Sequence, residues 1–196
     1  VILSGLRRLE YRGYDSAGLA VLHEGRVETL KNPGKVRLLA DRVSAAWNDD
    51  FCSSVHTGIA HTRWATHGPP TEANAHPHMD PSGRIAIVHN GIIENFADLR
   101  RVLESKGHVF RSQTDSEVIA LLIAEFHQGD LLAAVCAALR HVEGTFGLAV
   151  LSTDRPDSFV VARRGSPIVI GVADGETLVA SDASPILSHT QRVIYL

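Results

Sequence analysis

Polar and aromatic side chains crowd into one ten-residue segment, HTRWATHGPP, at residues 61–70, and four of them are candidate site residues. They are Arg63, Trp64, Thr66 and His67. A guanidinium is the natural bidentate partner of a carboxylate or phosphate, and a hydroxyl and an imidazole add directional hydrogen bonds. The alternative is an arginine that forms an ion pair within the fold, with the indole packed on it. Because loops beside rigid strands often carry sites, we favour a binding function for this segment.

Asn90-Gly91 and Asp115 offer complementary chemistry. Asn90-Gly91 follows an apolar run, and its local sequence favours a simple hairpin turn. Its functional interpretation is an oxyanion hole, formed by the asparagine amide and the glycine backbone N–H. Asp115 lies in the helix-capping pattern TDSE, where a carboxylate in the first turn can simply stabilise the helix through its dipole. Together, Arg63 would bind an α-carboxylate, Asp115 an α-ammonium and Asn90-Gly91 an oxyanion, a combination that fits glutamine.

No nucleophile or metal-binding pattern accompanies this set. Cys52 lies in a polar connector without a basic neighbour, and Cys136 lies in the apolar segment LLAAVCAAL, where we expect a core side chain. The 11 histidines include the pair His76 and His78, but the chain has no HExxH or CxxC pattern. We therefore expect no metal and no cofactor, and a histidine-rich metal binder is the weakest alternative.

Hydrophobic periodicity predicts the elements that must position these residues. Helices are expected at residues 1–12, 36–47, 95–106, 114–127, 131–141 and 182–188, and strands at 17–22, 26–31, 55–61, 85–89, 146–151, 158–163, 168–172, 177–180 and 192–196. Turn signals such as Glu24-Gly25 and Asp174-Gly175 join successive strands. The sheets should therefore be mostly antiparallel and the fold class α+β.

The bulk composition narrows the function classes. The 196 residues are 44% hydrophobic and 21% charged, which fits a single domain spanning residues 1–196. The net charge is -3 and the charges are interleaved, which argues against nucleic-acid binding. No apolar run approaches the ~20 residues of a membrane span. The two cysteines form no disulfide framework and no signal peptide is visible, so we expect a cytoplasmic protein.

Several long motifs closely resemble the glutaminase domain of the glucosamine-6-phosphate synthase family, a group of class II glutamine amidotransferases. They are LRRLEYRGYDSAG at 6–18, GIAHTRWATHG at 58–68, NAHPH at 74–78, VHNGIIEN at 88–95 and TDSEVIA at 114–120. The resemblance implies an N-terminal-nucleophile fold, an αββα sandwich with two mostly antiparallel sheets between helix layers. It also implies glutamine hydrolysis by an N-terminal cysteine whose own α-amine acts as the base.

The resemblance also assigns roles to individual residues. Arg63 resembles the residue that binds the glutamine carboxylate, Asp115 the one that binds its amine, and Asn90 with Gly91 the oxyanion hole. The other residues that it places around the substrate are Trp64, Thr66, His67 and His76. Arg12 and Tyr14 would lie near the nucleophile and the ammonia exit. The implied partners are L-glutamine and the sugar isomerase domains of the same enzyme, which is expected to be a homo-oligomer.

The sequence departs from the family pattern at both ends. The opening cysteine strand and the sugar isomerase half are absent from these residues. We therefore expect a truncated glutaminase domain, inactive alone, from an enzyme that converts fructose 6-phosphate to glucosamine 6-phosphate. Two alternatives stay open: the glutaminase domain of another class II amidotransferase, and a non-catalytic amino-acid-binding fragment.

Overall fold

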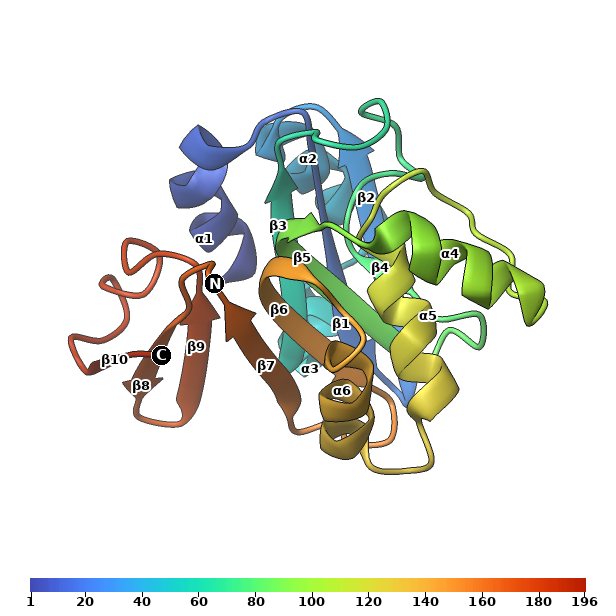
Figure 1. Cartoon of the computed structure of the whole chain (residues 1–196). Coiled ribbons are helices and arrows are strands. Elements are labelled where there is room, and N and C mark those ends of the chain that lie inside the picture. The colour runs from blue at the N-terminus through green and yellow to red at the C-terminus, as the bar shows by residue number, and fades with distance from the viewer.

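Two antiparallel sheets stack face to face, and helices cover their outer faces (Figure 1). The structure, a computed structural model, describes all residues from 1 to 196. The first sheet has the strand order β2-β1-β3, with β1 at Ser16–His23, β2 at Arg26–Pro33 and β3 at Thr57–Arg63. β1 and β2 meet at the predicted turn, where Glu24 and Gly25 have φ angles of 46° and 74°, as a two-residue hairpin turn requires.

The second sheet carries the central strands of the domain, and a third, smaller sheet lies at its side. The second sheet has the order β4-β5-β6-β7, with β4 at His78–Met79, β5 at Ile85–Ile93, β6 at Gly144–Ser152 and β7 at Phe159–Arg164. The third has the order β10-β8-β9, with β8 at Val169–Ala173, β9 at Glu176–Ala180 and β10 at Val193–Tyr195. Every strand pair is antiparallel, as the hairpin signals predict.

Three apolar clusters hold the layers together. The helices are α1 at Ile2–Leu9, α2 at Val36–Ala46, α3 at Asp49–Ser54, α4 at Phe96–Ser105, α5 at Glu117–Phe126 and α6 at Leu131–Leu139. The largest cluster packs α5 and α6 on the second sheet, and another packs α1 and α2 on the first. Between the sheets lie Ala20, Leu22, Ile59, Ala86, Val88 and Leu151. The order helix, sheet, sheet, helix confirms the expected αββα sandwich.

Asn90-Gly91 is not the hairpin turn that its local sequence favours. β5 continues through both residues to Ile93, where it pairs with Gly144 of β6. Gly91 has a φ of 150°, and a Cβ atom there would lie 2.1 Å from the carbonyl oxygen of Thr145. Glycine is therefore required by the close approach of β6 and not by a turn.

Other expectations differ from the structure in smaller ways. Residues 182–188 form turns and no regular helix, while α3 and β4 were not predicted. Cys136, expected in the core, is exposed. The buried residues of α6 are Leu131, Ala134, Val135, Ala138 and Leu139, which follow helical spacing. Cys136 lies on the opposite face, because an apolar segment does not by itself show which side of a helix packs inward.

Candidate functional site

A cavity of about 1450 Å³ brings most of the predicted site residues together. Its lining includes Arg12, Arg63, Trp64, Thr66, His76, Asn90, Gly91 and Asp115. These residues come from the 3-10 turn at Glu10–Arg12, the end of β3, the second half of β5, the loop between β3 and β4, and the segment before α5. Of the predicted residues, only His67 and Tyr14 do not line the cavity.

Arg63 lies at the end of β3, where the register pairs it with Ser16 of β1, and it is only 4% exposed. Its guanidinium donates hydrogen bonds to the carbonyls of His67, Gly68 at 3.2 Å and Pro69 at 3.4 Å. It also lies 3.9 Å from the Asp15 carboxylate. Burial lowers the pKa of Arg63, and nearby carboxylates oppose that shift. Arg63 therefore braces its own loop, and two of its five N–H groups stay without a partner in the chain.

Trp64 does not cover this guanidinium. Its indole is 59% exposed, and the Tyr14 ring meets it edge-on with 5.6 Å between ring centroids. The two aromatic side chains therefore form an exposed pair at the rim of the cavity. Arg12 turns elsewhere and donates to the carbonyl of Ser181 at 3.0 Å, which ties the segment after α1 to the end of β9.

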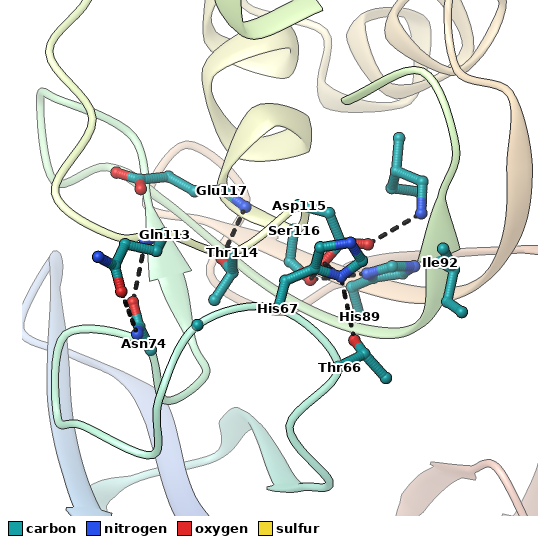
Figure 2. Close-up of polar contacts among 12 residues, drawn as sticks. Thr66, His67, Asn74, His89, Ile92, Gln113, Thr114, Asp115, Ser116 and Glu117 are labelled. Carbon is teal, nitrogen blue, oxygen red and sulfur yellow. Dashed lines mark hydrogen bonds and ion pairs between the residues drawn. The ribbon is translucent and has the colours of Figure 1, made fainter. Parts of the chain in front are cut away.

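Asp115 is the buried carboxylate of the site, at 3% exposure (Figure 2). Its Oδ2 accepts a 2.9 Å hydrogen bond from the backbone N–H of Ile93, so the carboxylate is tied to the strand that carries Asn90 and Gly91. Its Oδ1 lies 3.8 Å from Nδ1 of His67, which in turn contacts the Thr66 hydroxyl at 3.2 Å. The Asp115 carboxylate therefore contacts β5 and the loop after β3, in addition to lying at the start of α5.

The side chain of Asn90 is free to act on a ligand. It lines the cavity, is partly buried and forms no hydrogen bond within the chain. Gly91 beside it also lines the cavity, and as a glycine it places no side chain between its backbone and a ligand. An amide donor next to such a glycine is the arrangement that an oxyanion hole needs.

Four imidazoles cluster at the cavity: His61, His76 and His89 line it, and His78 packs against His76. The side chains of His76, His78 and His89 are buried, and that of His61 is partly buried. The ring centroids of His61 and His76 are 4.3 Å apart, and those of His76 and His78 are 4.7 Å apart. Burial lowers the pKa of His61 to about 3 and the pKa values of His76 and His78 well below 6.5. These imidazoles are therefore neutral at pH 7. The chain contains no group of three or more ligands that could hold a metal ion.

Two buried residues that the sequence did not single out fix the loops around the cavity. Asn74 donates to the carbonyl of Pro69 at 2.9 Å and accepts from the backbone N–H of Gln113 at 2.9 Å (Figure 2). Glu117 accepts from the backbone N–H groups of Arg111 at 2.8 Å and Ser112 at 2.7 Å. Asn74 therefore joins the loop of Arg63 to the segment of Asp115. Asn74 lies in the motif NAHPH and Glu117 in the motif TDSE, but neither motif reveals these contacts.

Ser116 and His89 were also missed by the sequence analysis. Nδ1 of His89 lies 2.8 Å from the Ser116 hydroxyl, which lies 3.4 Å from Oδ1 of Asp115. His89 immediately precedes Asn90 in β5, so the strand that supplies the oxyanion donor also contacts the neighbour of the buried carboxylate. The sequence does show a histidine, His89, at the end of an apolar run. It does not show that Ser116 is the hydrogen-bond partner of this histidine.

Comparison with known proteins agrees with this geometry. Residues 61–188 match the family described as a glutamine amidotransferase domain. The chain is 53% identical over its whole length to the glutamine–fructose-6-phosphate aminotransferase (isomerizing) of Chlorobaculum tepidum, and 47% identical to that of Aquifex aeolicus. It spans about a third of the length of these curated relatives, 32% in both cases.

Solved structures show the same fold at lower sequence identity. The glutamine phosphoribosylpyrophosphate amidotransferase of B. subtilis aligns with a TM-score of 0.76 and 24% identity, over 99% of this chain and 41% of that one. A structure described as the allosteric regulatory enzyme of purine biosynthesis aligns with a TM-score of 0.78, 24% identity and the same coverage of both chains. No helix of the chain combines the length and apolar character that crossing a membrane requires. With a family match over most of its residues, the chain belongs to the glutamine amidotransferase domain family.

Proposed function

We propose that the chain recognises L-glutamine and stabilises the oxyanion that forms when the glutamine side-chain amide is attacked. The observation that supports this most directly is that Arg63, Asp115 and Asn90-Gly91 line one cavity. A cation, an anion and a neutral donor pair match the α-carboxylate, the α-ammonium and the amide oxygen of one amino acid. We treat residues 1–196 as one glutaminase domain.

Each group has a distinct part in this proposal. The unpartnered N–H groups of Arg63 would bind the α-carboxylate, while Oδ1 of Asp115 would accept from the α-ammonium. The Asn90 amide and the Gly91 N–H would donate to the side-chain oxygen as negative charge develops on it, and such donors act most strongly in the transition state. Trp64, Thr66 and His76 would complete the walls, and His67 would act from beside Asp115. Arg12 and Tyr14 would lie at the exit.

The attacking atom is not proposed among the cysteines of the chain. Cys52 and Cys136 are both exposed, and neither has a hydrogen bond or ion pair with a basic side chain that would stabilise a thiolate. By family resemblance the nucleophile is an N-terminal cysteine. We therefore restrict the proposal for these 196 residues to substrate binding and oxyanion stabilisation.

The names of the relatives suggest where the ammonia goes. They are aminotransferases that act on glutamine and fructose 6-phosphate, and the chain spans about a third of their length. We propose that this domain supplies ammonia for the conversion of fructose 6-phosphate to glucosamine 6-phosphate by sugar isomerase domains of the same enzyme. A cytoplasmic location and a homo-oligomeric enzyme belong to the same proposal.

Calorimetry with the chain, and activity assays with the protein expressed from its intact gene, test these steps separately. The chain should bind L-glutamine and discriminate against D-glutamine, because Arg63 and Asp115 fix the α-substituents. Arg63→Lys should weaken binding, while Arg192→Lys, a matched change in an exposed ion pair, should not. The intact protein should produce glucosamine 6-phosphate. Ammonia release without that product would indicate another class II amidotransferase, and no glutamine binding would refute the proposal.

A further inference from the structure

We propose that His89 is a positioning residue: its Nδ1 accepts a hydrogen bond from the Ser116 hydroxyl and thereby keeps one carboxylate oxygen of Asp115 free for the α-ammonium group of the substrate. This inference rests on the proposed function, because it concerns the carboxylate that would hold that ammonium group. It adds two residues, His89 and Ser116, to those that determine how the substrate binds.

The contacts of His89 leave its ring little freedom. The side chain is 2% exposed and belongs to the central strand β5. Its Nε2 lies 3.3 Å from the carbonyl oxygen of Thr145 on the neighbouring strand, and its Nδ1 lies 2.8 Å from the Ser116 hydroxyl. Both ring nitrogens therefore have one partner each, and His89 lies beside Ser116 and Asp115 (Figure 2).

The positions of the protons follow from these partners. A carbonyl oxygen can only accept, so Nε2 of His89 must carry a proton. A neutral imidazole has a single N–H, so Nδ1 is an acceptor and the Ser116 hydroxyl donates to it. The hydroxyl has one hydrogen and cannot donate to Asp115 as well. Oδ2 of Asp115 already accepts from Ile93, and Nδ1 of His67 lies 3.8 Å from Oδ1, too far for a hydrogen bond, so Oδ1 is available to a ligand.

The surroundings keep His89 neutral. Burial is the main cause that lowers the pKa of His89, whereas Asp115 raises it. The other titratable groups near it are His61, His76 and His78. A protonated His89 would donate from Nδ1 to Ser116, and the hydroxyl would then turn to Oδ1 of Asp115. In that arrangement it would compete with the α-ammonium.

Nuclear magnetic resonance of the unaltered chain, with ¹⁵N-labelled histidine, tests the proton positions without any ligand. At pH 7.5 His89 should give the signals of a neutral ring with the proton on Nε2, and Ser116→Ala should shift its Nδ1 resonance. His89→Gln identifies the signal among the 11 histidines. A proton on Nδ1, or a doubly protonated ring at pH 7.5, would overturn the inference.

A double-mutant cycle tests the consequence for glutamine. His89→Leu frees the Ser116 hydroxyl to occupy Asp115, and affinity should fall about tenfold, the effect of one hydrogen bond to a charged group. Adding Ser116→Ala removes the competing hydroxyl and should restore most of that loss. His89→Gln should retain more affinity than His89→Leu, because an amide can accept from Ser116 and donate to Thr145. Near-ultraviolet circular dichroism confirms that each variant is folded.

A matched control separates this role from a purely structural one. His61→Leu makes the same change in a neighbouring imidazole that does not contact Ser116. Any loss of affinity in His61→Leu should not be restored by Ser116→Ala. Glutamine binding without rescue of His89→Leu would overturn this inference alone. Absence of glutamine binding by the unaltered chain would instead overturn the proposed function, and the substrate part of this inference with it.

Discussion

Mild acid should destabilise the domain strongly, because its buried imidazoles must be neutral in the folded state. His76 and His78 are buried and His61 is partly buried, and desolvation holds their pKa values far below the ordinary value of 6.5. In the unfolded chain the same side chains titrate near 6.5. The unfolded state therefore binds more protons below pH 6.5, and the free energy of unfolding falls as the pH is lowered through that value.

The size of the effect follows from the number of these side chains. Between pH 7.5 and 5.5, each imidazole that protonates only when unfolded lowers the free energy of unfolding by about 1.4 kcal/mol. Three of them give a loss of about 4 kcal/mol, a large share of the ~5–15 kcal/mol that stabilises a typical domain. His89, whose pKa is also lowered, adds to the loss in the same direction. Carboxylates contribute little in this range because most titrate below it.

Urea unfolding, followed by circular dichroism at several pH values from 5.5 to 7.5, measures this slope. Replacement of one titrating group by His78→Gln should reduce the slope by about a quarter to a third, since an amide can still form a hydrogen bond with the Thr114 hydroxyl and cannot be protonated in this range. His56→Gln, at an exposed histidine, should leave the slope unchanged. A free energy of unfolding that is constant between pH 7.5 and 5.5 would refute the reasoning.

Three further substitutions probe the site. Asp115→Asn should weaken L-glutamine binding at least tenfold in calorimetry, and should leave the binding of glutaramate, which has no α-amine, far less affected. Gly91→Ala should destabilise the domain by about 3 kcal/mol or more in urea unfolding, because a Cβ atom would lie 2.1 Å from the Thr145 carbonyl oxygen, whereas Gly5→Ala in α1 meets only an ordinary 3.5 Å contact. Asn74→Ala should cost about 1–3 kcal/mol in the same assay, since the Gln113 N–H loses its acceptor.

The fold was largely predictable because periodicity and turn signals are local. The apolar pattern of β1 and the Glu24-Gly25 turn predicted a hairpin, and the structure contains it. Asn90-Gly91 shows the limit of this reasoning. The same dipeptide that forms a turn in isolation lies inside β5, because β6 pairs with it and approaches so closely that only glycine fits. A signal that depends on a neighbouring strand cannot be obtained from the local sequence.

The residue types of the candidate site could be predicted from the sequence, but the hydrogen bonds between them could not. Arg63, Asp115 and Asn90 were predicted because a guanidinium, a carboxylate and an amide have obvious ligands, and the structure places all three on one cavity. Asn74 and His89 were missed because their importance lies in their partners. An asparagine that joins two loops and a histidine that accepts from a serine have the same sequence signature as any buried polar residue.

The proposed binding of an amino acid requires that the histidines near Asp115 be neutral. With the four imidazoles uncharged, Arg63 and Asp115 are the charged side chains of the proposed amino-acid subsite, and Arg12, Asp157 and Glu176 also line the cavity. Asp15 lies against Arg63, and its Oδ2 accepts from the backbone N–H of Ala65, so Asp15 is committed to the fold. Within this subsite, Asp115 is the carboxylate that keeps an oxygen for a ligand. A positive charge on His89 would compensate the negative charge of Asp115. An α-ammonium group would then gain less from the same carboxylate. Recognition of an amino acid at this position therefore requires that burial keep the imidazoles from taking up protons.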